Sequence, residues 1–255
     1  MGIIERPQVV RRALSGRAKS TEGTRSSRHY ETRRALATGA LVALAAAALP
    51  VADAGPALAA PAATCSACGR NLILNPGAEA GPGTNSDSVV KVPDWKGTGG
   101  FTAAQYAWSG GDLSPTTPGP KNRGKNYFYG GPDAATSIGT QVIAIPAGAV
   151  SSGKIDFLLS GWLGGYSSQG DNAALTVAFL NSTGSALAAS KIGPVTEAQR
   201  DGNSELLYRQ YKGVVPATTT RVSIRLVILR TDGSDNDGMA DNLGLVFSPA
   251  PAKSS

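Results

Sequence analysis

The amino-acid sequence predicts an all-β fold: a two-sheet antiparallel β-sandwich with jelly-roll connections. Short apolar runs recur along the chain after residue 59. Glycine is concentrated in the same part of the chain, which holds 27 of the 32 glycines, mostly between those runs, and this indicates frequent turns. No helical stripe of comparable strength is present; only residues 195–200 have the pattern of a helical turn or two.

Nine segments have the character of β-strands. In chain order they span residues 72–74, 103–108, 127–129, 140–145, 155–162, 175–180, 206–215, 221–229 and 243–247. The clearest is 221–229, where polar residues alternate with apolar ones that face one side: Val222, Ile224, Leu226 and Ile228. The chain after residue 59 has the length of one domain, so we expect one sandwich at 71–248, after a short segment at 60–70 and before a disordered tail at 249–255.

Residues 1–59 have the pattern of an export signal. They hold 9 Lys+Arg and 4 Asp+Glu, and their residues 35–49 form an uncharged run rich in alanine and leucine. A membrane-spanning helix needs about 20 apolar residues, so this shorter run favours a signal peptide over an uncleaved anchor. We predict cleavage after Ala59, with Ala54 as the alternative, and a secreted, extracellular protein that is free of the membrane. The TRRAL segment at 32–36 leaves twin-arginine and Sec export both open.

Charge and histidine content exclude several functions. After residue 59 the chain has 15 Lys+Arg and 14 Asp+Glu, so the pI of about 9.4 comes from the leader and no nucleic-acid partner is expected. The only histidine is His29, which also lies in the leader. A mature domain without histidine has no Ser-His-Asp or Cys-His mechanism and lacks the commonest zinc ligand.

The two cysteines, Cys65 and Cys68, are expected to form a small local disulfide. An exported chain meets an oxidising environment, and a bridge here would fasten the start of the domain. A thioredoxin-type redox centre would need a helix N-terminus in a βαβ context, and a zinc ribbon would need a second cysteine pair; the sequence supplies neither.

Motifs at both ends of the domain carry a resemblance to a known family. The chain has NLILNPGAE at 71–79, PDW at 93–95 and DGMADNLGL at 237–245. Together, at this spacing, they resemble the galactose-binding-like jelly rolls of carbohydrate-binding modules, over residues 71–247. In such modules the last strand begins beside the first motif. Ala78 departs from the aromatic residue that is frequent at its position in the family.

The resemblance also implies a structural calcium ion. Several of those modules hold Ca²⁺ with the glutamate of the first motif and the aspartate of the last, so Glu79 and Asp241 are the metal candidates here. A hard cation with oxygen ligands fits such a clamp between the chain ends. The alternative is that Glu79 accepts backbone hydrogen bonds in a turn and Asp241 caps a strand. Residues 232–238 do not fit an EF-hand loop and are expected to form a tight hairpin turn.

Sugar recognition needs flat aromatic surface beside amides and carboxylates. The segment 162–172 combines these groups on a glycine-rich loop that leaves a strand, and further aromatic residues flank the basic polar segment 121–126. The candidate ligand-binding residues are Trp108, Tyr127, Tyr129, Trp162, Tyr166, Gln169, Asp171 and Asn172. For each aromatic residue the alternative is a place in the core.

These observations favour a secreted, non-catalytic, monomeric module that binds a polysaccharide or a cell-surface glycan. One alternative is an extracellular structural or adhesion protein, which would use a flat apolar patch or an open edge strand. The other is a glycan-active enzyme that uses two carboxylates about 5 to 9 Å apart. No pair of acidic residues is singled out by the sequence, so we expect no enzymatic activity.

Overall fold

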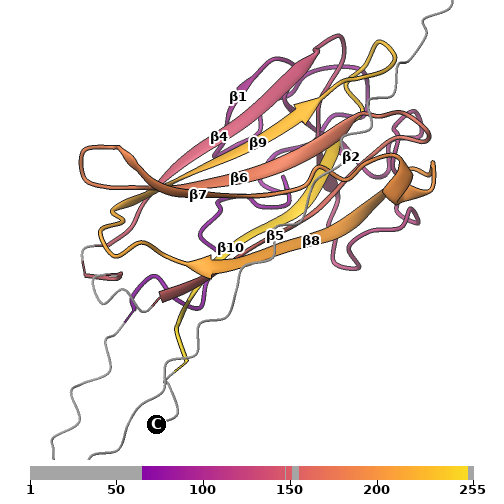
Figure 1. The fold of residues 1–255 in the computed structure, drawn as a ribbon. Helices are drawn as coiled ribbons and strands as arrows, with labels where there is room; N and C mark the ends of the chain where they lie inside the picture. The colour runs from indigo at the N-terminus through magenta and orange to yellow at the C-terminus, as the bar shows by residue number, and fades with distance from the viewer. Residues whose placement is uncertain (1–64, 147, 151–154, 252–255) are drawn as a thin grey trace, which may run out of the picture. The chain divides into compact units, whose positions relative to one another are not determined.

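The protein is a sandwich of two five-stranded sheets in a computed structural model that describes residues 65–146, 148–150 and 155–251 (Figure 1). The predicted all-β, two-sheet antiparallel fold is therefore confirmed. The strands are β1 (Lys96–Thr98), β2 (Thr102–Gln105), β3 (Asn126–Tyr129), β4 (Thr136–Ala144), β5 (Ile155–Gly165), β6 (Asn172–Leu180), β7 (Ala186–Ile192), β8 (Glu205–Val214), β9 (Arg221–Leu229) and β10 (Met239–Pro249). A short 3₁₀ helix, η1 (Ala198–Arg200), lies where the sequence predicted a helical turn.

The two sheets have the strand orders β1-β4-β9-β6-β7 and β2-β3-β10-β5-β8, and every strand pair is antiparallel. Alternate residues of the long strands face the space between the sheets, as the burial of β9 shows: Val222, Ile224, Leu226 and Ile228 are all completely buried. They meet Phe157, Leu159 and Phe247 from the facing sheet in one apolar core. Burial of these side chains is the main source of the sandwich's stability.

Eight of the nine predicted strands are present, and three details differ. Residues 72–74 are not a strand; Asn71 forms only an isolated bridge with Val246. Strands β1 and β7 were not predicted, because nearly all of their residues are exposed and carry no apolar alternation. Residues 232–238 are not a hairpin turn, because they connect β9 and β10, which belong to different sheets.

The start of the domain is fastened to the last strand. Gly69 donates a backbone hydrogen bond to Phe247, and Leu72 donates one to Leu245. The Asn71 side chain adds two more, donating to the Leu243 carbonyl at 2.8 Å and accepting from the Leu245 amide at 3.0 Å. The first motif therefore lies beside the last strand, as the family resemblance implied.

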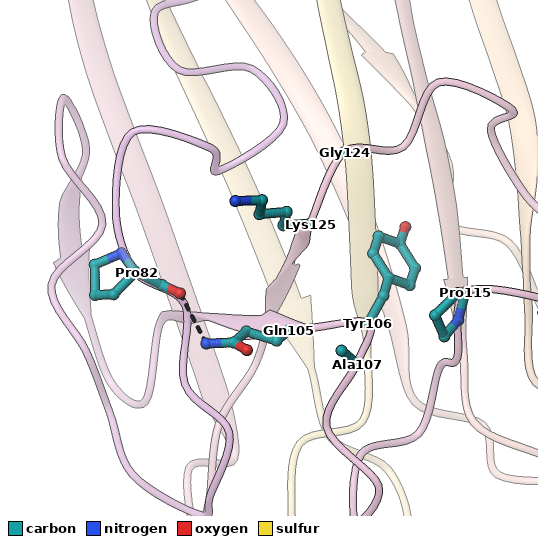
Figure 2. Close-up of a pocket in the computed structure, with 7 residues that line it drawn as sticks. All are labelled: Pro82, Gln105, Tyr106, Ala107, Pro115, Gly124 and Lys125. Atoms are coloured by element: carbon teal, nitrogen blue, oxygen red, sulfur yellow. Dashed lines mark hydrogen bonds between the residues drawn. The ribbon is translucent and has the colours of Figure 1, made fainter.

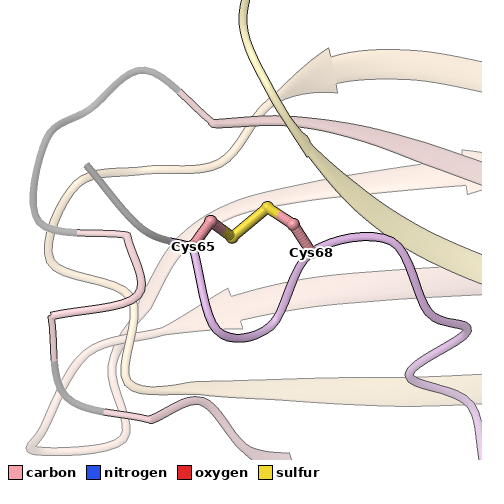
Figure 3. Close-up of a disulfide and its surroundings, with 2 residues drawn as sticks. All are labelled: Cys65 and Cys68. Carbon is pink, nitrogen blue, oxygen red and sulfur yellow. A yellow bond between two sulfur atoms is a disulfide. The ribbon is translucent and has the colours of Figure 1, made fainter. Parts of the chain in front are cut away.

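Cys65 and Cys68 are joined by a disulfide at the beginning of the described chain (Figure 3). Their Cα atoms are 5.3 Å apart, which is within the usual range for a bridge. The predicted export signal at 1–59 and the end of the predicted tail, residues 252–255, lie outside the described residues. In the ranges that the structure describes, no helix is long and apolar enough to cross a membrane.

Candidate ligand-binding site

The outer face of the sheet β2-β3-β10-β5-β8 carries a second apolar cluster, separate from the main core. The residues of this outer cluster are Ala104, Tyr106, Leu113, Tyr127, Tyr129, Leu206 and Met239. Tyr106 and Leu113 come from residues 106–125, the long connection between β2 and β3, and the others come from the strands or their ends. The connection therefore lies on this face of the sheet and covers part of it.

Arg123 organises this connection from within. Its guanidinium donates to the carbonyls of Pro120 and Ser114, both at 3.0 Å, and of Thr117 at 2.6 Å. The same group lies 4.8 Å from the centre of the Tyr106 ring, in the position of a cation–π contact. The planar fork of arginine suits such multiple contacts, so Arg123 holds the connection in one shape over the sheet.

Four aromatic side chains in the strands and connections of this sheet remain partly or well exposed. Trp108 and Trp162 are half-buried and pack against the outer cluster. Tyr208 is 43% exposed and its ring centre is 5.6 Å from that of Trp162. Tyr166, at the end of β5, is 38% exposed. These four residues, which we call the aromatic rim, offer apolar ring surface to solvent at one side of the sheet.

Tyr127 and Tyr129 are placed differently from what the sequence predicted. Both are buried in the outer cluster, so neither presents a ring to a ligand at the surface. Their backbones belong to β3, and the 106–125 connection packs over their side chains because its own Tyr106 and Leu113 also need burial. The two tyrosines form the floor of the site, and their hydroxyls reach toward its acidic end.

A pair of carboxyl groups marks that acidic end. Asp112, on the 106–125 connection, lies close enough to Asp237, which precedes β10, for the Asp237 charge to act on it. Burial, followed by the neighbouring Asp237 and Asp235 charges, raises the pKa of Asp112 to about 8. Burial also raises the pKa of Asp237, while the Tyr129 hydroxyl, which donates to its Oδ1 at 3.0 Å, opposes that rise.

Asp171 has a structural role, unlike the ligand contact that the sequence predicted. Its side chain is completely buried. Its Oδ1 accepts from the amides of Thr231 at 2.6 Å and Asp232 at 2.9 Å, and its Oδ2 accepts from the amide of Asp237 at 2.8 Å. All its hydrogen bonds thus go to the segment between β9 and β10. Asp171 therefore holds the Asp237 backbone in place beside the outer cluster.

Buried Arg200 fixes the loop that follows β5. It donates to the carbonyls of Ser167 and Gln169, both at 2.8 Å, and to that of Asn203. The Gln169 side chain in turn lies near Asp237, where it acts to lower the pKa of that carboxyl. Asn172 donates to the Gly170 carbonyl at 3.0 Å within the same loop. Gln169 therefore belongs to the acidic end of the site, whereas Asn172 shapes the turn.

The two predicted metal ligands, Glu79 and Asp241, lie on either side of one turn. A Cβ atom at Gly77 would be 3.3 Å from Asp241 Oδ1 and 3.7 Å from Glu79 Cγ. Glu79 accepts from the amides of Lys125 and Asn126, and Asp241 accepts from the Tyr106 hydroxyl at 2.8 Å. Burial raises the pKa of Asp241 to about 8, and the Glu79 charge adds to the rise. The oxygen donors suit a hard cation. Within the described residues, however, no group of three or more His, Cys, Asp or Glu side chains is arranged for a metal.

A cavity of about 480 Å³ opens beside the 106–125 connection (Figure 2). Its lining residues are Pro82, Gln105, Tyr106, Ala107, Pro115, Gly124 and Lys125. The Gln105 amide is engaged with the carbonyls of Pro82 and Gly83, and the Tyr106 side chain is buried. Its walls therefore lack an exposed aromatic face, which distinguishes this cavity from the aromatic rim.

No protein-family model matches the sequence, and no curated protein matches it. Solved structures of similar fold exist. The chain is similar to TmCBM61 in complex with β-1,4-galactotriose, with 15% identity and a TM-score of 0.44 over 71% of this chain and 99% of that one. It is similar to a cyclase from Fischerella sp. TAU, with 18% identity and a TM-score of 0.45 over 71% and 97%.

A third similar structure is the enzymatically active domain of tailspike protein 4 from bacteriophage CBA120, with 17% identity and a TM-score of 0.44. The match covers 70% of this chain and 21% of the tailspike, so the chain spans about a fifth of that protein. Carbohydrate-binding modules recur among the similar structures. At identities and TM-scores this low, the function has to be argued from the site.

The structure gathers part of the predicted site and adds residues that the sequence did not single out. Trp108 and Trp162 pack against the outer cluster, and Gln169 lies near Asp237. The residues added by the structure are Tyr208, which packs beside Trp162, and Asp112 and Asp237, whose charges act on each other. Asp237 lies in the motif at 237–245, which indicated the family but did not predict a ligand contact. No sequence pattern around Asp112 predicted a functional role for it. Only the packing of the 106–125 connection onto the sheet brings these two carboxyl groups together.

Proposed function

We propose that this protein is a secreted, non-catalytic glycan-binding module, and that the aromatic rim with the Asp112–Asp237 carboxyl pair is its binding site. One observation carries the proposal: partly exposed Trp108 and Trp162 pack against the same outer cluster, in which the Tyr129 hydroxyl donates to Asp237 Oδ1 at 3.0 Å. Sugar rings stack their C–H faces on aromatic rings, while carboxyls and amides bind the hydroxyl groups. The export signal predicted at 1–59 agrees with an extracellular polysaccharide or cell-surface glycan as partner.

The burial of Asp237 supports binding without hydrolysis. Its side chain is only 6% exposed and accepts from the Tyr129 hydroxyl at 3.0 Å. Glycoside hydrolysis by two carboxyl groups requires both of them to reach the scissile bond.

The test is binding of insoluble polysaccharides by the purified protein and by single-site variants. Trp108→Ala and Trp162→Ala should each weaken retention about tenfold or more, because each removes one ring face from the rim. Tyr211→Ala is the matched control: Tyr211 is 48% exposed but packs beside Phe157, away from the rim. If Tyr211→Ala reduced retention as much as the two tryptophan variants, the rim would not be the binding site.

Calcium is part of the proposal as a stabilising ion held by Glu79 and Asp241. The closeness of both side chains to the turn at Gly77 supports it, since a cation between them would balance two neighbouring carboxylates. Calcium should raise the midpoint of thermal unfolding relative to the chelated protein, and Glu79→Gln should reduce that rise. Identical unfolding curves with calcium and with chelator would remove calcium from the proposal.

An adhesive or structural role has one observation in its favour. Strand β7 lies at the edge of its sheet, and residues 186–189 are all exposed and uncharged. However, the pairing of β6 with β7 contains an irregularity near Leu180, and such bulges oppose continuation of a sheet into another molecule. We therefore propose a monomer. Sedimentation of the protein as a concentration-dependent oligomer would favour the adhesive role.

A further inference from the structure

The cavity beside the 106–125 connection combines apolar walls with an exposed lysine. Pro82, Ala107 and Pro115 give it apolar surface, and Lys125 adds an ammonium group. Figure 2 shows the Lys125 side chain extending toward the side of the cavity where Pro82 lies. In the part of the chain that the structure describes, this ammonium forms no ion pair. The volume of about 480 Å³ lies within the range of about 300–1,000 Å³ that is usual for small-ligand sites.

The Pro82 wall and the backbone of Lys125 are both held by hydrogen bonds, so the cavity exists before a ligand arrives. The Gln105 side-chain amide donates to the carbonyls of Pro82 at 2.9 Å and Gly83 at 3.1 Å. The backbone amide of Lys125 donates to both carboxylate oxygens of Glu79, at 3.0 and 3.1 Å. These contacts fix the Lys125 backbone and leave its side chain available to a ligand. A preformed site loses little conformational entropy when it binds.

The cavity adjoins the aromatic rim through one turn of the backbone. Ala107, which lines the cavity, is followed directly by Trp108 of the rim. The Trp108 amide donates to the Gln105 carbonyl at 3.0 Å, so this turn holds the tryptophan next to the cavity. A chain of sugars that stacks one ring on Trp108 therefore has a second binding position in the adjoining cavity.

Positive charge predominates around the cavity. The 106–125 connection ends with Lys121, Arg123 and Lys125. Glu79, beside this end, has both oxygens engaged with backbone amides. Burial raises the pKa of Asp241, which accepts from the hydroxyl of a cavity-lining tyrosine, to about 8, so this carboxyl is mainly protonated at pH 7. An anionic group therefore suits the cavity better than a cationic one.

Building on the proposed glycan-binding function, we propose that the glycan contains a sugar with a carboxylate group, such as glucuronic acid, and that this carboxylate binds the Lys125 ammonium in the cavity. A carboxylate and an ammonium form charge-assisted hydrogen bonds, which are stronger than those between neutral groups. The C–H surface of the acidic sugar lies against Pro82 and Pro115, while a neighbouring neutral sugar stacks on Trp108.

Calorimetric titration with matched neutral and acidic tetrasaccharides tests the proposal. The pairs are β-1,4-linked tetramers of glucose, of galactose and of mannose. One member of each pair is neutral, and the other has one terminal sugar oxidised at C6 to a carboxylate. We expect the acidic member of a bound pair to bind about five- to tenfold more tightly at low ionic strength. Because Lys125 is exposed, high salt should reduce this difference.

Variants at Lys125 separate this inference from the proposed function. Lys125→Met removes the charge and keeps an apolar stem, so it should abolish the preference for the acidic tetramer while the neutral one stays bound. Lys125→Arg should retain part of the preference. Lys191→Met, at an exposed position of β7 in the other sheet, is the matched control and should change neither affinity. Trp108→Ala should weaken both members of the pair.

A preference for the acidic tetramer that survives in Lys125→Met would overturn the assignment of the carboxylate to this cavity. Equal affinity for the two members, with both weakened in Trp108→Ala, would overturn the carboxylate inference and leave the glycan-binding function standing. If glucuronic acid alone bound as tightly as the acidic tetramer, the link between cavity and rim would be wrong. Absence of binding to every tetramer and polysaccharide would overturn both proposals.

Discussion

Replacing Asp171 is the sharpest test of how the acidic end of the site is built. The Asp171 carboxylate is completely buried and accepts three backbone amides, from Thr231, Asp232 and Asp237. In Asp171→Asn the remaining oxygen can still serve the Thr231 and Asp232 amides, which both bind Oδ1. The new NH₂ group then faces the Asp237 amide, so two donors oppose each other.

The expected cost follows from these contacts. One lost charge-assisted hydrogen bond with a buried unpaired donor destabilises a protein by about 2–3 kcal/mol. Asp171→Ala leaves all three amides without their acceptor and should cost about 3–6 kcal/mol, with water satisfying the more accessible two in part. Since domains are stable by about 5–15 kcal/mol in total, the alanine variant should be close to unfolding.

Urea unfolding followed by tryptophan fluorescence measures both values. The midpoint should shift while the m-value stays constant, and Asp87→Asn and Asp87→Ala serve as matched controls at an exposed aspartate. The reasoning is refuted if Asp171→Asn and Asp171→Ala each cost less than about 0.5 kcal/mol, a loss typical of surface positions. A loss of glycan binding without loss of stability would instead make Asp171 the ligand contact that the sequence predicted.

Two further predictions concern the sheet and the carboxyl pair. Gly164→Ala should destabilise the protein by at least about 2 kcal/mol, because a Cβ atom on β5 would lie 1.8 Å from the Glu205 carbonyl oxygen on β8. Gly119→Ala is the control: its Cβ atom would have its nearest contact at 3.4 Å, so urea unfolding should show almost no change in stability. Asp112, whose folded pKa of about 8 exceeds its unfolded value of 3.8, contributes stability that is fully present below about pH 4 and is lost as the pH rises through 8. Asp112→Asn should therefore reduce the fall in unfolding free energy between pH 5 and pH 9 by at least about 1 kcal/mol, and an unchanged pH profile would contradict the raised pKa of Asp112.

Local pattern explains which strands could be predicted. In β9 the apolar residues alternate because one side of the strand is buried, and that alternation is visible in the sequence. Strand β7 has no such alternation, because it lies at the sheet edge with both sides of residues 186–189 in solvent. The strand conformation of β7 comes from its hydrogen-bonded pairing with β6, and the residues of β7 alone do not reveal that pairing.

The site shows the same division between local and long-range information. The sequence indicated aromatic and amide residues at 162–172; of these, Trp162 packs against the outer cluster and Tyr166 is exposed. It did not distinguish exposed aromatic residues from buried ones, so Tyr127 and Tyr129 were expected at the surface although they form the floor. Burial of a strand residue depends on what packs over the sheet, and here that is the 106–125 connection.

By itself, the sequence determined that glycine-separated strands with period-two alternation would form a sandwich, and that its end motifs would lie together. The alternation of apolar and polar residues and the residue types of turns are properties of neighbouring residues, so a short stretch of sequence is enough to recognise them. Only the tertiary structure decided that Asp112 meets Asp237, that Asp171 holds the last loop, and that three carboxyls share one end of the sheet. These relations depend on burial and on charges brought from distant parts of the chain, because a carboxyl's protonation follows its surroundings rather than its sequence neighbours.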